Sequence, residues 1–119
     1  MNYLDTYALM ELMQGNPHYQ PIINEPFMVC DVTLAEFYVT VLRDHGISTA
    51  QQYIQRFLPF QEASSLEILI KGVSFRQEKK KSNISFFDAV GYQHAVHNKG
   101  IFVTGDSAFK ELPSVKFIK

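Results

Sequence analysis

The sequence predicts an α/β protein built on a mostly parallel sheet. Short apolar runs bounded by Gly and Pro alternate with segments whose apolar residues recur at helical spacing. One late segment, residues 85–99, is apolar on nearly every side, which is typical of a helix buried between layers. With 119 residues, 46% of them hydrophobic, the chain fits a single domain, residues 1–119, whose core needs no disulfide.

The first quarter of the chain is expected to hold two strands and one helix. Residues 2–5 are short and apolar, which predicts the first strand, and residues 7–14 have the spacing of a helix that Gly15 ends. Three prolines within residues 16–26 predict a loop. Residues 27–30 are a continuous apolar run, which predicts a second, buried strand.

Three helices are predicted next. In residues 33–44 an apolar stripe recurs at i, i+3, i+4, i+7 and i+8, and it consists of Leu34, Phe37, Tyr38, Val41 and Leu42. A second helix is expected over residues 49–58, closed before Pro59. The third begins at Ser64 or Ser65 and runs toward three consecutive lysines.

The last part of the chain predicts one more helix and two strands. The helix covers residues 85–99 and is capped by Gly100. Residues 101–104 follow as a short apolar strand, and residues 115–118 as a final edge strand. Because ligands of open parallel sheets bind beyond the carboxyl ends of the strands, we expect the chemistry in the residues that follow each strand.

Charge and cysteine content exclude several protein classes. Eleven Lys and Arg against twelve Asp and Glu give a net charge of −1, so bulk charge does not indicate a nucleic-acid binder, although a local basic patch would suffice. Cys30 is the single cysteine, and no Cys/His spacing of a zinc site is present. Since neither a secretory leader nor a run of about 20 apolar residues is found, a cytoplasmic location is expected.

Four carboxylates stand just beyond the predicted strands. Asp5 stands at the end of the first predicted strand, and Asp106 follows the strand of residues 101–104. Glu36 lies in the first turn of the helix after the second strand, and Asp88 in the first turn of the all-round apolar helix. Like charges gathered in a partly buried place raise one another's pKa unless a cation neutralises them. Mg²⁺ and Mn²⁺ take oxygen ligands and suit phosphodiester hydrolysis.

Each of these acids also has a purely structural interpretation. Three pairs match the capping box of a helix N-terminus, namely Thr33-x-x-Glu36, Ser85-x-x-Asp88 and Ser64-x-x-Glu67. No chemistry is assigned to the last pair. Asp5 would serve as a helix N-cap and Asp106 as a turn residue. Spacing alone leaves the catalytic and the structural interpretations open.

Four motifs, in their order along the chain, resemble one known family. They are Tyr3-Leu4-Asp5-Thr6, Thr33-Leu34-Ala35-Glu36, Phe87-Asp88-Ala89 and Phe102-Val103-Thr104-Gly105-Asp106-Ser107-Ala108-Phe109. Together they resemble the PIN-domain family, and within it most closely the VapC-type toxins of toxin–antitoxin pairs. The last motif, Thr104-x-Asp106 followed by Phe109, is the most specific.

The resemblance implies a three-layer α/β/α fold and an endoribonuclease that depends on Mg²⁺ or Mn²⁺. Carried over by motif, the metal-binding and catalytic acids are Asp5, Glu36, Asp88 and Asp106, with Thr6 and Thr104 as supporting polar groups. The metal would lower the pKa of a bound water for attack on phosphorus in single-stranded RNA. Many relatives carry a further acid where this chain has Ala108, so a second metal would be weaker or absent. A toxin-type member would also form a homodimer and bind an antitoxin.

Basic and histidine side chains admit two interpretations each. One basic cluster, Arg76 with Lys79, Lys80 and Lys81, would either contact the RNA backbone or form a solvated helix end. His94 and His97 have the i, i+3 spacing of metal ligands, but without further ligands we expect them to pack or to face solvent. Cys30 is expected to be a small core residue.

Other functions are compatible with the sequence. They include a PIN-like RNA-processing nuclease without an antitoxin and a non-catalytic RNA- or protein-binding module on the same fold. A weaker alternative is a phosphatase of small phosphate esters on another α/β fold. An adjacent reading frame for an antitoxin would distinguish the first of these from a toxin. A response to Mn²⁺ would argue against the binding module.

Overall fold

Parallel strands form the centre of the structure. The computed structural model describes residues 1–119 and contains a five-stranded sheet in the order β3-β2-β1-β4-β5, with every neighbouring pair parallel. The strands are β1 (Asn2–Leu4), β2 (Phe27–Cys30), β3 (Gln61–Glu62), β4 (Ile101–Thr104) and β5 (Val115–Phe117). The four predicted strands are therefore confirmed, and β5 lies at an edge. The pattern does not predict β3, because its two residues are polar.

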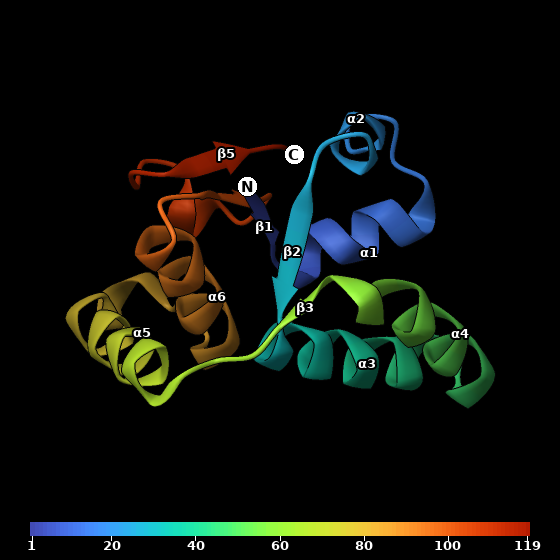
Figure 1. The fold of residues 1–119 in the computed structure, drawn as a ribbon, viewed down its shortest axis with the longest axis horizontal. Coiled ribbons are helices and arrows are strands. Elements are labelled where there is room, and N and C mark those ends of the chain that lie inside the picture. The colour runs from blue at the N-terminus through green and yellow to red at the C-terminus, as the bar shows by residue number, and fades with distance from the viewer.

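Helices cover both faces of this sheet, as Figure 1 shows. One face is covered by α1 (Thr6–Gln14), α2 (Gln20–Ile23), α3 (Asp31–His45) and α4 (Ile47–Phe57), and the other by α5 (Leu66–Glu78) and α6 (Phe86–His97). Three short 3₁₀ helices complete the chain, at Leu58–Phe60, Lys80–Ser82 and Ser107–Phe109. The fold is a three-layer α/β/α sandwich, as predicted. None of its helices has the length and apolar character needed to cross a membrane.

Both faces of the sheet are buried because successive side chains point to opposite sides. Leu4, Val29 and Val103 belong to the larger core, formed with α1, α3 and α4. Tyr3 and Phe102 belong to the core on the other face, formed mainly with α6. A sheet with two buried faces needs apolar residues at every position of its inner strands, which explains the continuous apolar runs in the sequence.

Two local signals are overridden by their surroundings. The prolines of residues 16–26 predict a loop, but Pro21 lies in the first turn of α2, where a helix needs no backbone N–H. Ser65, and not Ser64, caps α5 by accepting a hydrogen bond from the Ile68 amide at 3.2 Å. The interpretation of Ser64 as the first residue of a capping box is therefore wrong.

Helix α6 is the most deeply enclosed helix of the structure, as its all-round apolar sequence predicts. Its buried residues face every direction and are Ala89, Val90, Gly91, Tyr92, His94 and Ala95. It packs against the sheet on one side and against α5 on the other. The approach to α5 is close, because a Cβ at Gly72 would lie 2.7 Å from Val90 Cγ2 and 3.0 Å from the Val90 Cα.

We expect Gly72→Ala to destabilise the protein. The added methyl group would meet the Val90 backbone, which cannot move without shifting α6, so overpacking should cost about 1–3 kcal/mol. Urea unfolding of this variant, compared with Ser74→Ala at an exposed position of the same helix, measures the difference. Equal stability of the two variants would show that α5 and α6 separate easily.

Candidate active site

The four predicted acids line one cleft at the carboxyl ends of β1 and β4. These two strands are parallel neighbours, with Leu4 opposite Val103, so the residues that follow them emerge side by side. The cleft has a volume of about 390 Å³ and is lined by Asp5, Thr6, Tyr7, Glu36, Thr40, Asp88, Gly105, Asp106, Ser107 and Lys119. The topology thus brings together acids that are as far apart in sequence as Asp5 and Asp106.

Asp5 lies at the floor of this cleft and has both a structural role and an unmet electrostatic need. It is 1% exposed. One oxygen accepts a hydrogen bond from the Ala8 amide at 2.8 Å, which makes Asp5 the N-cap of α1, and the other accepts one from Thr104 Oγ1 at 2.5 Å. Burial, followed by the charge of Asp88, raises the pKa of Asp5 well above its usual range against the effect of these two hydrogen bonds.

Asp88 reaches the cleft from the first turn of α6. Its amide donates to Ser85 Oγ at 3.1 Å, so Ser85 is the N-cap, as predicted. Burial raises the pKa of Asp88 to about 7, and the charges of Glu36 and Asp106 add to that increase. The ionised form of Asp88 is therefore disfavoured by burial and by its acidic neighbours, and no ion pair offsets these two effects.

Glu36 is held at the cleft by a threonine from another helix. Thr6 Oγ1, at the start of α1, donates a hydrogen bond to Glu36 Oε1. Helix α3 begins at Asp31, with Cys30 at the N-cap position, so Glu36 lies in the second turn. The interpretation of Thr33-x-x-Glu36 as a capping box is wrong, because Thr33 is buried inside the helix.

Asp106 and Thr104 form the wall that follows β4. The Asp106 amide donates to Thr104 Oγ1 at 3.0 Å, and the Asp106 carboxylate accepts from the Ala108 amide at 2.9 Å. The second hydrogen bond makes Asp106 the cap of the 3₁₀ turn Ser107–Phe109. Ala108 itself packs against the core beneath α6 and is absent from the cleft lining. This chain therefore has no fifth acid at that point.

The cleft suits a divalent cation. None of the four ion pairs in the structure includes Asp5, Glu36, Asp88 or Asp106. A buried carboxylate without a cationic partner must either take up a proton or bind a cation. All four side chains offer hard carboxylate oxygens, which are the donors that Mg²⁺ and Mn²⁺ prefer. The residues present therefore fit the metal that the sequence predicts.

Several residues that line the cleft lie outside the set of site residues that the sequence predicts. Thr40 is one helical turn beyond Glu36, so helical spacing would have placed it on the same face. Tyr7, Ser107 and Gly105 adjoin predicted site residues and follow from them. Lys119 is different, because only the pairing of β5 with β4 brings it to the cleft.

The predicted basic cluster lies apart from the cleft lining. Arg76 Nε donates to the Ile84 carbonyl at 3.0 Å, and Arg76 and Lys80 line a separate small pocket of about 200 Å³. Lys79 is the C-cap of α5, and Lys80 and Lys81 lie in the 3₁₀ helix Lys80–Ser82. Neither of the two interpretations of this cluster is decided by its position.

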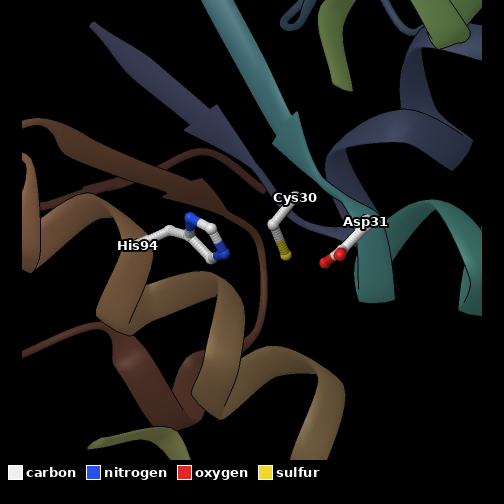
Figure 2. Close-up of side chains that lie close together, drawn as sticks. All are labelled: Cys30, Asp31 and His94. Atoms are coloured by element: carbon white, nitrogen blue, oxygen red, sulfur yellow. The ribbon is translucent and has the colours of Figure 1, made fainter. Parts of the chain in front are cut away.

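A second polar group, Cys30, Asp31 and His94, lies where β2 meets α3 and α6 (Figure 2). Its ligand-type atoms lie within 4.8 Å of one another, with the Cys30 sulfur between the other two side chains. Hydrogen bonds already occupy the group: Ser64 Oγ donates to Asp31 at 2.6 Å and lies 2.8 Å from His94 Nε2. Burial raises the pKa of Cys30 to about 11, which keeps the thiol neutral. Asp31 and His94 are therefore joined through Ser64, while the Cys30 sulfur lies 3.1 Å from Thr33 Oγ1.

Of the two histidines of α6, one packs in the core and the other faces solvent, and these are the two environments that the sequence predicts. His94 is fully buried, and burial lowers its pKa. Its Nδ1 has no hydrogen-bond partner and lies 3.9 Å from Glu62 Oε1. His97 is exposed and lies 3.2 Å from Lys71 Nζ. The pair does not converge on a common ligand.

Comparisons with known proteins agree with this geometry. Residues 3–115 match the PIN domain, and the chain therefore belongs to the PIN-domain family. A comparison with curated proteins finds no match. Nucleases of this family generally use a divalent metal ion.

Similar solved structures are components of toxin–antitoxin systems. A toxin–antitoxin complex from Klebsiella pneumoniae has a TM-score of 0.76 at 22% identity, covering 98% of this chain and 96% of that one. VapBC2 from Rickettsia felis, bound to a promoter DNA fragment, has a TM-score of 0.75 at 19% identity and covers 99% and 98%. VapC20 of Mycobacterium tuberculosis, a toxin that cleaves the sarcin–ricin loop, has a TM-score of 0.71 at 13% identity and covers 83% and 84%. At identities of 22% or less, these structures show that the chain shares their fold.

The metal-free protein should lose stability as the pH rises from about 4 to about 7. Asp88 has a pKa of about 7 in the folded state and an ordinary value of 3.8, so in this window the folded chain binds more protons than the unfolded chain. Asp5 acts in the same direction. Thermal unfolding in a chelator at pH 5, 6, 7 and 8 measures the effect.

Asp88→Asn is the matched comparison, because it removes the carboxyl group whose pKa burial and neighbouring charges raise, and it should flatten the decrease. His94, whose pKa is lowered, acts in the opposite direction near its ordinary value of 6.5, but equally in both proteins. Identical pH profiles for the wild type and Asp88→Asn would show that folding does not raise the pKa of Asp88.

Proposed function

We propose that this protein is a divalent-metal-dependent endoribonuclease whose active site is the acidic cleft. The observation that carries the proposal is the set of four carboxylates that line one cleft without any ion pair. The PIN-domain match across residues 3–115 supports the same reaction class. We also propose that residues 1–119 act as a single catalytic domain.

The acids would hold the metal, and two threonines would hold the acids. Asp5, Asp88 and Asp106, together with Glu36, would ligate Mg²⁺ or Mn²⁺. A bound ion would stabilise charge on the phosphate and lower the pKa of an attacking water. Thr104 donates to Asp5 at 2.5 Å and Thr6 donates to Glu36, so each hydroxyl fixes the orientation of one carboxylate. A bound cation would also lower the raised pKa of Asp88 and so favour the ionised carboxylate that binds it.

Single-stranded RNA is the substrate we favour. The cleft is open to solvent and has a volume of about 390 Å³, which suits the flexible backbone of an unpaired RNA strand. The neighbour from Mycobacterium tuberculosis cleaves an RNA loop, which supports an unpaired RNA substrate. The basic cluster of Arg76, Lys79, Lys80 and Lys81 would add contacts to the phosphate backbone outside the cleft.

A toxin role would bring a protein partner and a second copy of the chain. We propose an antitoxin and a homodimer, in the cytoplasm, on the basis of the toxin–antitoxin neighbours. Apolar surface is present for such contacts. A groove of about 300 Å³ is lined by residues that include Leu12, Met13, Phe57 and Phe60.

Replacing the acids by amides should abolish cleavage while the fold persists. Asp5→Asn and Asp88→Asn remove ligands without changing side-chain size, and Thr104→Val, which removes one supporting hydroxyl, should weaken Mn²⁺ binding by about 10- to 100-fold. Cleavage of a labelled single-stranded RNA and the Mn²⁺-induced rise of the unfolding midpoint measure the two effects. Glu67→Gln, an acid on exposed α5, is the control. Full activity of Asp88→Asn would sink the proposal.

Neutralising the basic cluster should weaken RNA binding in a salt-dependent manner. If Lys79, Lys80 and Lys81 all contact phosphates, changing them to Gln should lower the slope of log K against log salt by about 2, because each contact on single strands contributes about 0.7. Fluorescence anisotropy at several salt concentrations measures the slope. An unchanged slope would identify the cluster as a solvated helix end.

A further inference from the structure

Lys119 is the single basic residue among the ten that line the acidic cleft. Its Nζ donates to the Gly105 carbonyl at 3.3 Å and lies 5.8 Å from the centre of the Tyr7 ring. It forms no ion pair with any of the four acids. The ammonium group is therefore held in place by a carbonyl and a ring, and its charge is not matched by a carboxylate.

The main chain that carries Lys119 is fixed at several points. The Ile118 amide donates to the Thr104 carbonyl at 2.9 Å and continues the pairing of β5 with β4. The Tyr19 hydroxyl donates to the Ile118 carbonyl at 2.5 Å, and His18 Nδ1 lies 3.2 Å from the Lys119 carbonyl oxygen. These bonds join the segment to β4 and to the loop after α1.

Gly105 makes this close arrangement possible. A Cβ at this position would lie 2.1 Å from the Tyr7 ring and 2.7 Å from the Ile118 carbonyl oxygen. The Tyr7 ring and the final segment therefore both pack directly against the backbone between Thr104 and Asp106. The lysine is held beside the residue that follows β4, which is also where the acids converge.

A cation in this position answers a problem that the acids create. RNA is a polyanion, and it must bring a phosphate to a cleft lined by four carboxylates. These carboxylates would hold a metal ion, which would offset part of their charge. One N–H of the Lys119 ammonium donates to the Gly105 carbonyl, so this group offers up to two further donors to phosphate oxygens.

We propose that Lys119 binds a phosphate of the RNA inside the cleft and positions it against the acids. This inference rests on the proposed nuclease function and adds one residue to it. Lys119 differs in this role from the basic cluster of residues 76–81, which does not line the cleft.

The test measures RNA binding in the absence of metal and cleavage. In an Asp88→Asn background, a fluorescein-labelled single-stranded RNA is titrated at several salt concentrations with and without Lys119→Gln. We expect binding about tenfold weaker, as for a lost hydrogen bond to a charged group, and a salt slope smaller by about 0.7. Lys119→Met, which keeps a flexible side chain but removes the charge, should behave alike, and Lys119→Arg should retain the slope.

Lys116→Gln is the matched control. Lys116 is an exposed lysine of β5 that does not line the cleft and whose Nζ lies 3.9 Å from Glu25. An equal loss in Lys116→Gln would assign the effect to overall charge and overturn the proposal. Unchanged binding in Lys119→Gln and Lys119→Met would overturn it too, and RNA cleavage by the wild type in Mn²⁺ would then leave the nuclease function standing. Absence of both RNA binding and cleavage in the wild type would refute the nuclease function and this inference together.

Discussion

Repulsion among four carboxylates is the constraint on which the rest of the structure depends. Burial and neighbouring charges raise the pKa of Asp5 and of Asp88, so ionising this cleft works against folding. The acids nevertheless stay close together, because they are attached to the sheet and to the helices that pack on it. Asp5 follows β1, Asp106 follows β4, and the two strands are hydrogen-bonded neighbours in the sheet. The pairing of these strands therefore holds Asp5 and Asp106 side by side without any ligand.

Packing on the two sides of the sheet opposes the repulsion. The larger core binds α1 and α3, and with them Asp5 and Glu36, to one face. On the other face the enclosed helix α6 carries Asp88, and the close contact of Gly72 with Val90 leaves α6 little room to withdraw. Apolar burial, which contributes about 25 cal/mol per Å², holds charged groups together that would separate if they were free. The unfavourable burial of acids in the cleft is thus offset by the apolar packing of the two cores around it.

The two polar groups of the molecule differ in how completely their charges and hydrogen bonds are matched. Around Cys30, Asp31 and His94, the donors and acceptors are largely matched through Ser64, and a single nitrogen lacks a partner. In the cleft, hydrogen bonds from Thr104 and from Thr6 orient two of the carboxylates and leave the negative charge of all four without a counterion. A matched network joins elements of the fold, here β2, α3 and α6. A cluster of carboxylates without cationic partners is a candidate site for binding a cation.

The sequence by itself determined the α/β class, the four longer strands, the principal helices and the four acids, because each depends on a local period or on a motif a few residues long. The tertiary structure alone decided the features that join distant segments. β3 exists because Gln61 and Glu62 pair with the edge of β2, and no apolar run marks them. Thr104 and Asp5 are 99 residues apart and share a hydrogen bond. Lys119 reaches the cleft only through the pairing of β5 with β4. A periodic pattern records which face of an element is buried, whereas a contact between segments depends on the packing of the whole chain, and packing has no local signature.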